Sequence, residues 1–281
     1  MFVTILMPCK NAKASFFRAA IDSVLTQSIS SWNLIIIDDH STATETLVVQ
    51  DELSELADER IVVCKNLSNL ITGALNTGMR QSKTPYVCAL HSDDLLDRNA
   101  IETLDRTILR YPDTDYFHSS RIHIDEDGQP LSGVLRARES FTVSDFKQVG
   151  PVKPLHCWKV QSALAIGGMD ESLGLHGADD YDFSWCMAEA GYSFKAISEC
   201  LYYVRDHREH YRLTTHVPLD TQIRELEKIW KKHGLTMQEI EEQLQRRKEG
   251  YLRQALYLNE QDRERKEKER YDIRQGWREE Y

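Results

Sequence analysis

Apolar and polar positions follow two different periods along the first half of the chain. Short apolar runs predict buried strands over Phe2–Met7, Leu34–Ile37, Ile61–Cys64 and Tyr86–Leu90. Between these runs the apolar residues recur every three or four positions, which is the spacing of an amphipathic helix. Strands that alternate with helices are typical of an α/β fold with a mostly parallel sheet.

Capping signals predict where the helices begin and end. Ser15 is a typical N-cap for the first helix, and Thr42 with Glu45 forms a capping-box pattern before a second helix that runs to about Leu56. Gly191 predicts the C-terminal end of a later helix. The expected helices after the second one span residues 72–81, 99–111 and 182–190.

The second half of the chain shows weaker strand signals. Residues 116–124 alternate and are followed by Asp127-Gly128, a pair typical of tight turns, so we expect an antiparallel hairpin at a sheet edge. A turn is expected at Gly167-Gly168. Further strands are expected over residues 156–160, 194–197 and 201–205.

The composition changes after about Pro218. Residues 219–281 hold 15 Lys and Arg and 15 Asp and Glu, so the net charge of −10 lies in the preceding part. This tail predicts two helices broken at His233-Gly234, with a capping box from Thr236 to Glu239. The apolar side of the second helix is marked by Ile240, Leu244, Tyr251, Leu252 and Leu256. We therefore expect a domain over residues 1–217 and a helical extension over 218–281. The extension is expected to pack back on the domain with some self-association, and the alternative is that it joins another enzyme.

Bulk properties exclude several classes of protein. A net charge of −10 argues against non-specific nucleic-acid binding, which requires a basic surface. Apolar runs fall far short of the roughly 20 residues that span a bilayer, and the start carries no secretory pattern. The six cysteines form no C-x-x-C pair, so we expect no zinc site or disulfide framework and a cytoplasmic location, with contact at the membrane periphery left open.

Pairs of acids follow two of the predicted strands. Asp38-Asp39 ends the second strand and Asp93-Asp94 follows the fourth. Neighbouring carboxylates repel one another, so both pairs are harder to explain as helix caps than as a binding site. A divalent cation such as Mn²⁺ or Mg²⁺ relieves this repulsion and binds ligand phosphates as well. His91 is interpreted as a residue beside such a metal rather than a ligand.

Two further clusters carry titratable groups. Asp179, Asp180 and Asp182 enter a helix; the helix dipole favours acids there, but three in four positions also suit a general base with a raised proton affinity. Residues 205–210 form a run of charged residues and histidines that either meets a diphosphate or is a solvated loop.

With these clusters in place, the chain resembles the family 2 glycosyltransferases of the GT-A fold from Phe2 to about Thr214. The similar segments are Val3–Asn11, Ser23–Ser28, Trp32–Ser41, Asn69–Gly78, His91–Asp94, Ile166–Glu171, Asp179–Phe183 and Arg205–His207. Leu70 stands where that family usually has glycine, and His91 replaces the first acid of its D-x-D metal motif. The resemblance implies a Rossmann-like, mostly parallel sheet flanked by helices.

The resemblance also implies a role for each matched residue. Asp180 falls on the position of the general base, and Asp39 on the residue that bonds the nucleotide base. The nucleotide-sugar residues are Pro8, Asn11, Asp38, Asp39, Asn69, Gly73, Asn76, Ser92 and Asp93. The metal residues are Asp93, Asp94 and His207. The residues on the acceptor or diphosphate side are Asp179, Asp182, Gly168 and Arg205.

The expected activity is an inverting transfer of a hexose or related sugar from a nucleotide-diphosphate donor, a UDP-sugar by preference, with Mn²⁺ or Mg²⁺. The acceptor is a hydroxyl of a glycan, a lipid-linked molecule or a protein, in glycan or cell-surface polysaccharide synthesis. A sugar nucleotidyltransferase is disfavoured because no G-x-G-x-R-L loop follows the first strand, and a P-loop kinase because its motif is missing. The alternative is an inactive nucleotide-binding scaffold that recruits a partner through its tail.

Overall fold

The computed structural model describes residues 2–148, 150–174, 178–206 and 219–246. Within these residues eight strands form one sheet, in the order β3-β2-β1-β4-β7-β6-β8-β5. The strands are β1 (Val3–Cys9), β2 (Asn33–Asp38), β3 (Ile61–Lys65), β4 (Tyr86–Ala89), β5 (Leu95–Leu96), β6 (Tyr116–Ile124), β7 (His156–Lys159) and β8 (Phe194–Arg205). Four of the neighbouring pairs are parallel and three are antiparallel, which confirms the expected mostly parallel α/β sheet.

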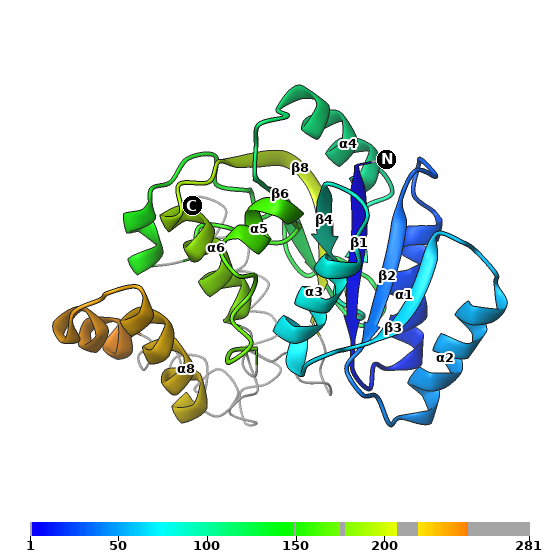
Figure 1. Cartoon of the computed structure of the whole chain (residues 1–281), viewed down its shortest axis with the longest axis horizontal. Helices are drawn as coiled ribbons and strands as arrows, with labels where there is room; N and C mark the ends of the chain where they lie inside the picture. The colour runs from blue at the N-terminus through cyan, green and yellow to red at the C-terminus, as the bar shows by residue number, and fades with distance from the viewer. Residues whose placement is uncertain (1, 149, 175–177, 207–218, 247–281) are drawn as a thin grey trace.

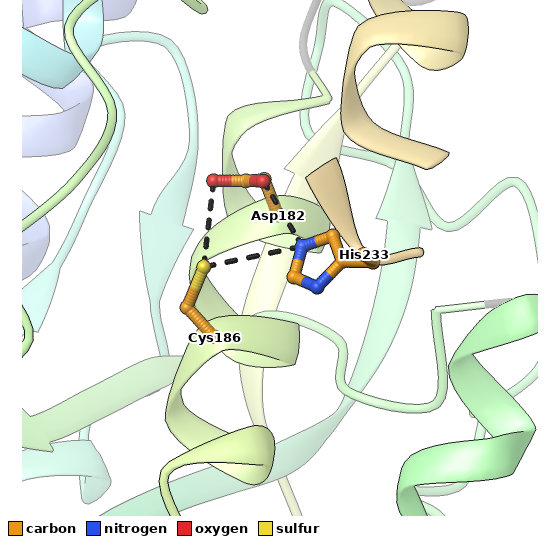
Figure 2. Close-up of side chains that lie close together, drawn as sticks. All are labelled: Asp182, Cys186 and His233. Carbon is orange, nitrogen blue, oxygen red and sulfur yellow. Dashed lines mark hydrogen bonds and ion pairs between the residues drawn. The ribbon is translucent and has the colours of Figure 1, made fainter. Parts of the chain in front are cut away.

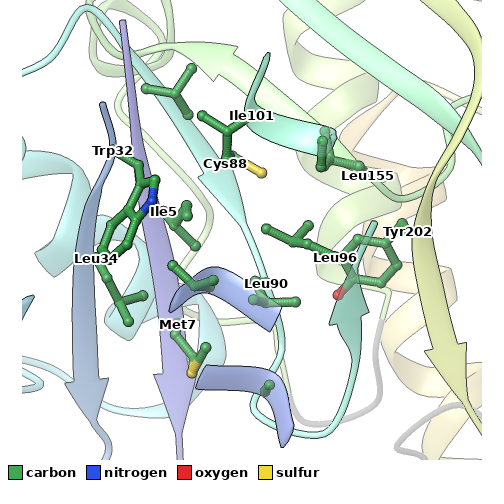
Figure 3. Close-up of a cluster of buried hydrophobic side chains, with 14 of the residues drawn as sticks. Ile5, Met7, Trp32, Leu34, Cys88, Leu90, Leu96, Ile101, Leu155 and Tyr202 are labelled. Atoms are coloured by element: carbon green, nitrogen blue, oxygen red, sulfur yellow. The ribbon is translucent and has the colours of Figure 1, made fainter. Parts of the chain in front are cut away.

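Helices cover both faces of this sheet (Figure 1). Successive residues of β1 point to opposite faces, so Ile5 and Met7 join one core while Leu6 joins the other. The first core, shown in Figure 3, packs β1, β2 and β4 against three helices on one face. Those helices are α1 (Ala14–Leu25), α2 (Thr44–Glu55) and α4 (Ala100–Arg110). The opposite face is covered by α3 (Leu70–Gln81), α5 (Val160–Ala165), α6 (Asp179–Glu189) and α8 (Leu219–Lys232).

The expected edge hairpin at residues 116–124 is wrong. Strand β6 lies inside the sheet, antiparallel to β7 and parallel to β8. The tight turn is present, because Gly128 has a φ of 82° and its N–H donates to the Asp125 carbonyl oxygen. The returning chain, however, makes only isolated bridges at Pro130 and Leu135. The place beside β6 is taken by β8, which also merges the two strands expected over 194–205 into one with an irregular register.

Two predicted helix caps are also wrong. Helix α1 begins at Ala14 after Lys13, and α2 begins at Thr44 after Ala43, in neither case with a side-chain cap from its own N-cap residue. The Asn11 side chain instead accepts hydrogen bonds from the backbone N–H groups of residues 42 and 43, at 2.7 and 2.9 Å. Glu45 accepts the N–H of Ala14 rather than closing a capping box on its own helix. The loop after β1 therefore bonds the chain just before α2, and the first turn of α2 bonds the start of α1.

The first part of the tail packs on the rest of the chain. Leu226, Ile229 and Trp230 of α8 lie in the second core with residues of α6. The predicted break at Gly234 is present (φ 74°), and a second helix spans residues 237–246. The capping box is confirmed, because Glu239 accepts from Thr236 and its own N–H donates to the Thr236 hydroxyl. Tyr251, Leu252 and Leu256 lie outside the described residues, and the domain division at residue 217 stays a prediction.

None of the helices in the described part of the chain combines the length and the apolar character needed to cross a bilayer.

Candidate active site

The carboxyl ends of β1 and β2 hold the first acidic pair. Asp38 is fully buried and accepts hydrogen bonds from Gln50 Nε2 at 3.0 Å and Lys65 Nζ at 2.5 Å. Burial opposes ionisation of this carboxyl, but its hydrogen bonds to Lys65, Ser41 and Gln50 outweigh burial and hold its pKa below the ordinary value. Asp38 is therefore a buried, ionised group that holds the loop after β2 through hydrogen bonds to both of its oxygens.

Asp39 follows Asp38 in the chain, and its side chain contacts the loops after β1 and β3. Its Oδ2 accepts from Lys10 Nζ at 2.9 Å, and its Oδ1 accepts from Asn66 Nδ2 at 2.7 Å. The structure therefore ties together the ends of β1, β2 and β3 through this one carboxylate. Pro8, at the end of β1, pairs in register with Ile37, so it lies beside the same edge.

The loop between β3 and α3 contains the predicted asparagine and glycine positions. Asn69 precedes α3 without a side-chain cap, and Leu70 has a left-handed backbone with a φ of 64°. A left-handed leucine is unusual and explains why glycine suits this position in the family that the sequence resembles. Gly73 sits so close to Ser68 that an added Cβ would lie 2.8 Å from the Ser68 Cβ. Gly73 thereby allows the loop to fold tightly over α3.

Asn76 joins α3 to the turn before α6. Its Nδ2 donates to the Met169 carbonyl at 2.9 Å and to Glu171 at 2.8 Å, while its Oδ1 accepts the Met169 N–H. Gly168 has a φ of 81°, and a Cβ there would lie 2.6 Å from the Asn76 Oδ1. Asn76 and Gly168 therefore build the frame of the site rather than presenting free polar groups to it.

The second acidic pair lies beyond the end of β4. Asp94 is buried, and its two oxygens accept hydrogen bonds from the Arg205 N–H at 2.7 Å and from the Tyr202 hydroxyl at 2.8 Å. Burial and the charge of Asp93 raise the pKa of Asp94 to about 6. His91, Asp93 and Asp94 each offer a ligand atom within 4.8 Å of the others. This raised proton affinity and the spacing fit a hard divalent cation, which would relieve the repulsion between the two acids. Ser92 lies between His91 and Asp93 in the same loop.

Arg205 braces this loop from β8. Its Nε donates to the Asp93 carbonyl at 2.9 Å, and one terminal nitrogen donates to the carbonyls of Asp125 and Glu126. Its guanidinium also lies 4.8 Å above the Phe16 ring. The predicted diphosphate contact of Arg205 stays a prediction, and His207, predicted as a metal ligand, lies outside the described residues.

Helix α6 presents the third cluster in its first turn. Asp179 is buried, and burial together with the charge of Asp180 raises its pKa to about 7. The Asp180 side chain is 42% exposed, and its Oδ2 lies 3.3 Å from Nε2 of His156 on β7. Burial opposes ionisation of Asp180, but the contact with His156 outweighs it and holds the pKa of Asp180 below its ordinary value. The raised proton affinity that the sequence predicted for a general base is therefore found at Asp179, which is about half protonated at pH 7, whereas the accessible Asp180 is ionised.

His156 is fixed in turn by a tyrosine. Its Nδ1 lies 3.0 Å from the Tyr116 hydroxyl, whose pKa is raised because the ring is buried. A hydroxyl that keeps its proton donates to Nδ1, which leaves the ring proton on Nε2, toward Asp180. The chain Tyr116–His156–Asp180 thus orients the carboxylate from two strands.

Asp182 belongs to a different environment from the other two acids. It is buried against the tail, where its oxygens contact Lys232 at 2.7 Å and His233 at 3.1 Å. The structure therefore does not bring Asp182 together with Asp180, although only two positions separate them.

Several residues of this site were not predicted from the sequence. Asn66, Lys10 and Tyr202 bond the predicted acids, and His156 contacts Asp180. Asn66 follows the apolar run of β3, so its place at a strand end was a usable signal. His156 and Tyr202 lie within apolar segments, where only the tertiary structure reveals their partners.

Comparisons with known proteins agree with this architecture. The sequence model of "Glycosyl transferase family 2" matches residues 4–151. A Myxococcus xanthus relative, "O-antigen biosynthesis protein RfbC", is 24% identical over 73% of this chain and 16% of its own length. The Staphylococcus aureus "Poly(ribitol-phosphate) beta-N-acetylglucosaminyltransferase TarP" is 41% identical over 36% of this chain and 31% of its own length. The chain thus spans less than a third of either relative.

A solved structure shares the fold. The crystal structure of S. aureus TarS 1-349 in complex with UDP-GlcNAc superposes with a TM-score of 0.65 at 15% identity, over 87% of this chain and 70% of that one. This likeness confirms the predicted GT-A architecture of a mostly parallel sheet flanked by helices.

Proposed function

The chain belongs to glycosyl transferase family 2, and from this membership and its site we propose that it is an inverting glycosyltransferase that moves a sugar from a nucleotide-diphosphate donor to an acceptor hydroxyl. The observation that carries the proposal is the state of Asp180. A carboxylate that is held ionised by His156 and is 42% exposed can take a proton from an incoming hydroxyl. Asp180 is therefore the proposed general base.

The donor in this proposal is a UDP-sugar. Its base and ribose are assigned to the edge formed by Pro8, Asn11, Asp38 and Asp39, with Asn69, Gly73 and Asn76 shaping the neighbouring loop and Ser92 and Asp93 facing the sugar diphosphate. The likeness to a TarS structure in complex with UDP-GlcNAc supports this class of donor. The carboxyl ends of β1, β2 and β4 are also where ligands bind in open α/β sheets.

The proposed metal site consists of Asp93 and Asp94, with His207 as an additional ligand. When bound there, Mn²⁺ or Mg²⁺ neutralises the charge that develops on the leaving diphosphate. Asp94 is prepared for such a cation by its burial, and Tyr202 and Arg205 fix the directions of its oxygens. His91, on the surface of the same loop, is 45% exposed and lies 3.7 Å from Asp94.

The reaction we propose is a single displacement. Asp180 removes the proton of the acceptor hydroxyl, whose oxygen attacks the anomeric carbon from the face opposite the diphosphate. Asp179, Gly168 and Arg205 are assigned to the acceptor or diphosphate side. The structure places Asp182, the fourth residue of that assignment, against α8, so we limit its role to holding α6. Relatives named as an O-antigen biosynthesis protein and a poly(ribitol-phosphate) beta-N-acetylglucosaminyltransferase support a cell-surface polysaccharide as the acceptor.

Two substitutions test the proposal. Asp180→Asn keeps the shape of the side chain but removes the base, so transfer or hydrolysis of UDP-GlcNAc should fall roughly 10²–10⁴-fold while UDP affinity stays unchanged. Asp94→Ala should abolish the Mn²⁺-dependent part of UDP-sugar binding measured by calorimetry. Near-normal turnover by Asp180→Asn contradicts the assignment of the base. A wild-type chain that binds UDP but never consumes any UDP-sugar in the presence of Mn²⁺ would support the inactive scaffold instead.

Residues 1–217 are the proposed catalytic domain, and the tail the proposed site of self-association. Sedimentation of the full chain over a range of concentrations tests the second part. A mass that stays monomeric at the highest concentration contradicts it.

A further inference from the structure

A cluster of potential metal ligands lies on the side of α6 that faces the tail. It consists of Asp182 and Cys186, one turn apart on α6, and His233, which follows α8 (Figure 2). We refer to these three residues as the Cys186 cluster. Each offers one ligand atom, and the three atoms lie within 4.8 Å of one another. None of the three belongs to the proposed donor or acceptor site.

The spacing inside the Cys186 cluster suits a small ion. The Nε2 of His233 lies 3.1 Å from Asp182 Oδ1, and the Cys186 sulfur lies 3.8 Å from Asp182 Oδ2 and 3.9 Å from Nε2. In a tetrahedral zinc site, bonds of about 2.0–2.3 Å place neighbouring ligand atoms roughly 3.3–3.8 Å apart. The distances from Nε2 to Oδ1 and from Nε2 to the sulfur lie within a few tenths of an ångström of this range. The 3.8 Å contact of the sulfur is with Oδ2, so the Asp182 carboxylate has to turn to complete the set.

A second layer of contacts orients the histidine for such a role. The Nδ1 of His233 lies 2.9 Å from a carboxylate oxygen of Glu189, without hydrogen-bond geometry, so the ring nitrogen away from the cluster has a charged carboxylate as its close neighbour. The ring also stacks on Trp185 at a centroid distance of 4.0 Å and an interplanar angle of 3°. A carboxylate on the far nitrogen of a metal-binding histidine is the usual arrangement in zinc proteins, because it fixes the ring and its tautomer.

The charges around the cluster allow a divalent ion. The His233 and Asp182 side chains are 1% and 2% exposed, so an ion here lies mostly below the surface, with the half-buried Cys186 on its more open side. Lys232 contacts Oδ2 of Asp182 at 2.7 Å and is also paired with Asp170 at 3.1 Å. Lys232 can remain paired with Asp170 and with Oδ2 of Asp182 while Oδ1 of Asp182 binds the ion. A dication with the Asp182 carboxylate, a Cys186 thiolate and a neutral imidazole is then electrically neutral.

We propose that Asp182, Cys186 and His233 form a zinc site that fastens α8 to α6, separate from the site for Mn²⁺ or Mg²⁺ at Asp93 and Asp94. Thiolate and imidazole ligands select zinc over the hard cations that carboxylates bind alone. Three protein ligands leave one tetrahedral position for water. Because α6 carries Asp180 in its first turn, the ion stabilises the helix on which the proposed base lies without touching the substrate.

Cobalt(II) reports directly on the sulfur ligand. The full chain is stripped with a chelator and titrated with Co²⁺, and the thiolate-to-cobalt charge-transfer band is recorded, followed by its displacement with Zn²⁺. We expect one equivalent of Co²⁺ to give the band in the wild type. The band should be lost in Cys186→Ser and kept in the matched control Cys200→Ser, which removes another half-buried cysteine. Glu189→Gln should keep the band but weaken metal affinity roughly 10–100-fold.

Two results would overturn the proposal. One is a wild-type chain that shows no thiolate–cobalt band and no thermal stabilisation by stoichiometric Zn²⁺. The other is a Cys186→Ser chain whose band equals that of the wild type. Asp94→Asn provides the control for the donor site, and its band should be unchanged. The wild-type measurement alone decides the question if the Cys186→Ser chain does not fold.

Discussion

Replacing His156 by leucine removes the group that faces the proposed base. In the wild type, Nε2 of His156 lies 3.3 Å from Asp180 Oδ2 and holds the pKa of that carboxyl below its ordinary value. Without this contact, Lys153 and the backbone N–H of Tyr181 are left to offset burial, so the pKa of Asp180 should rise. A lowered pKa supports activity above it, and the activity is lost as the pH falls through it. The leucine variant should therefore lose activity at a higher pH than the wild type.

The size of this change follows from the geometry. A hydrogen bond to a charged group contributes about 1.5–3 kcal/mol. The 3.3 Å contact lacks ideal hydrogen-bond geometry and Asp180 is 42% exposed, so solvent screening reduces the value to roughly 1 kcal/mol. Since about 1.4 kcal/mol corresponds to one pKa unit, the acidic limb should move up by roughly 0.5–1 pH unit.

The assay is the pH dependence of kcat/KM for UDP-GlcNAc turnover between about pH 4 and 8, because this ratio reports groups of the free enzyme. His156→Gln keeps a donor near Asp180 and should restore part of the wild-type profile. His123→Leu is the matched control, since it removes a histidine 3.2 Å from another carboxylate, Asp206, outside this contact. An acidic limb that is unchanged in His156→Leu, or that moves equally in His123→Leu, refutes the role of His156.

Three further predictions concern stability. Asp179→Asn should raise the melting temperature more at pH 8 than at pH 5. Folding raises the pKa of Asp179 from about 4 to about 7, so ionisation of this group destabilises the folded wild type at pH 8 but much less at pH 5, and asparagine removes this cost. An equal gain at both pH values contradicts this reasoning. Leu70→Gly should stabilise the chain by about 0.5 kcal/mol in urea denaturation, because the strain of a left-handed leucine costs more than the backbone entropy that glycine loses on folding. A loss of stability contradicts the strain at this position. Gly168→Ala should cost about 2 kcal/mol or more and Gly167→Ala less, because only the first adds a clash with Asn76 to an unfavourable φ; equal losses exclude the clash.

The central strands were predictable because a short continuous apolar run is a local sequence signal of a strand buried on both faces. Strands β1, β2 and β4 are apolar on both faces, and the observed bounds differ from the predicted ones by one or two residues. The place of β6 was not predictable, because its alternation fits an edge or an interior strand equally well and β8, some 70 residues later, decides between them. The two residues of β5 are too few to carry any periodicity.

Helix starts failed for a related reason. Capping motifs assume that a helix is capped by its own N-cap side chain. Here Asn11 from the loop after β1 satisfies the first N–H groups near α2, and Glu45 of α2 satisfies Ala14 of α1. The box of Thr236 and Glu239 forms as predicted, whereas Glu45, the acid of the other predicted box, accepts a hydrogen bond from α1 instead.

The residues of the candidate site also fall into those that were predictable from the sequence and those that were not. The acids at the ends of β2 and β4 were predictable, since a strand end can be located along the sequence and parallel strands end at one edge. Their partners were not, because Asn66, Tyr202 and His156 reach them from other elements. Leu70 lies between these cases: its mismatch with a usual glycine was visible in the sequence, and the structure gives the reason as a left-handed backbone.

Helix α6 shows most clearly what spacing along a sequence leaves undecided. Asp179, Asp180 and Asp182 occupy its first turn, and acids there are favoured by the helix dipole whatever else they do. Successive helical positions differ in direction by about 100°, so three acids within four positions face different neighbours. Asp180 meets His156 of β7, whereas Asp182 meets Lys232 and His233 of the tail. Asp179 is buried, and burial together with the charge of Asp180 raises its pKa to about 7. The first turn of α6 therefore carries both the proposed base and the acid that attaches α8. A substitution of Asp182 should lower the stability of the chain while leaving the pH profile of the reaction largely unchanged.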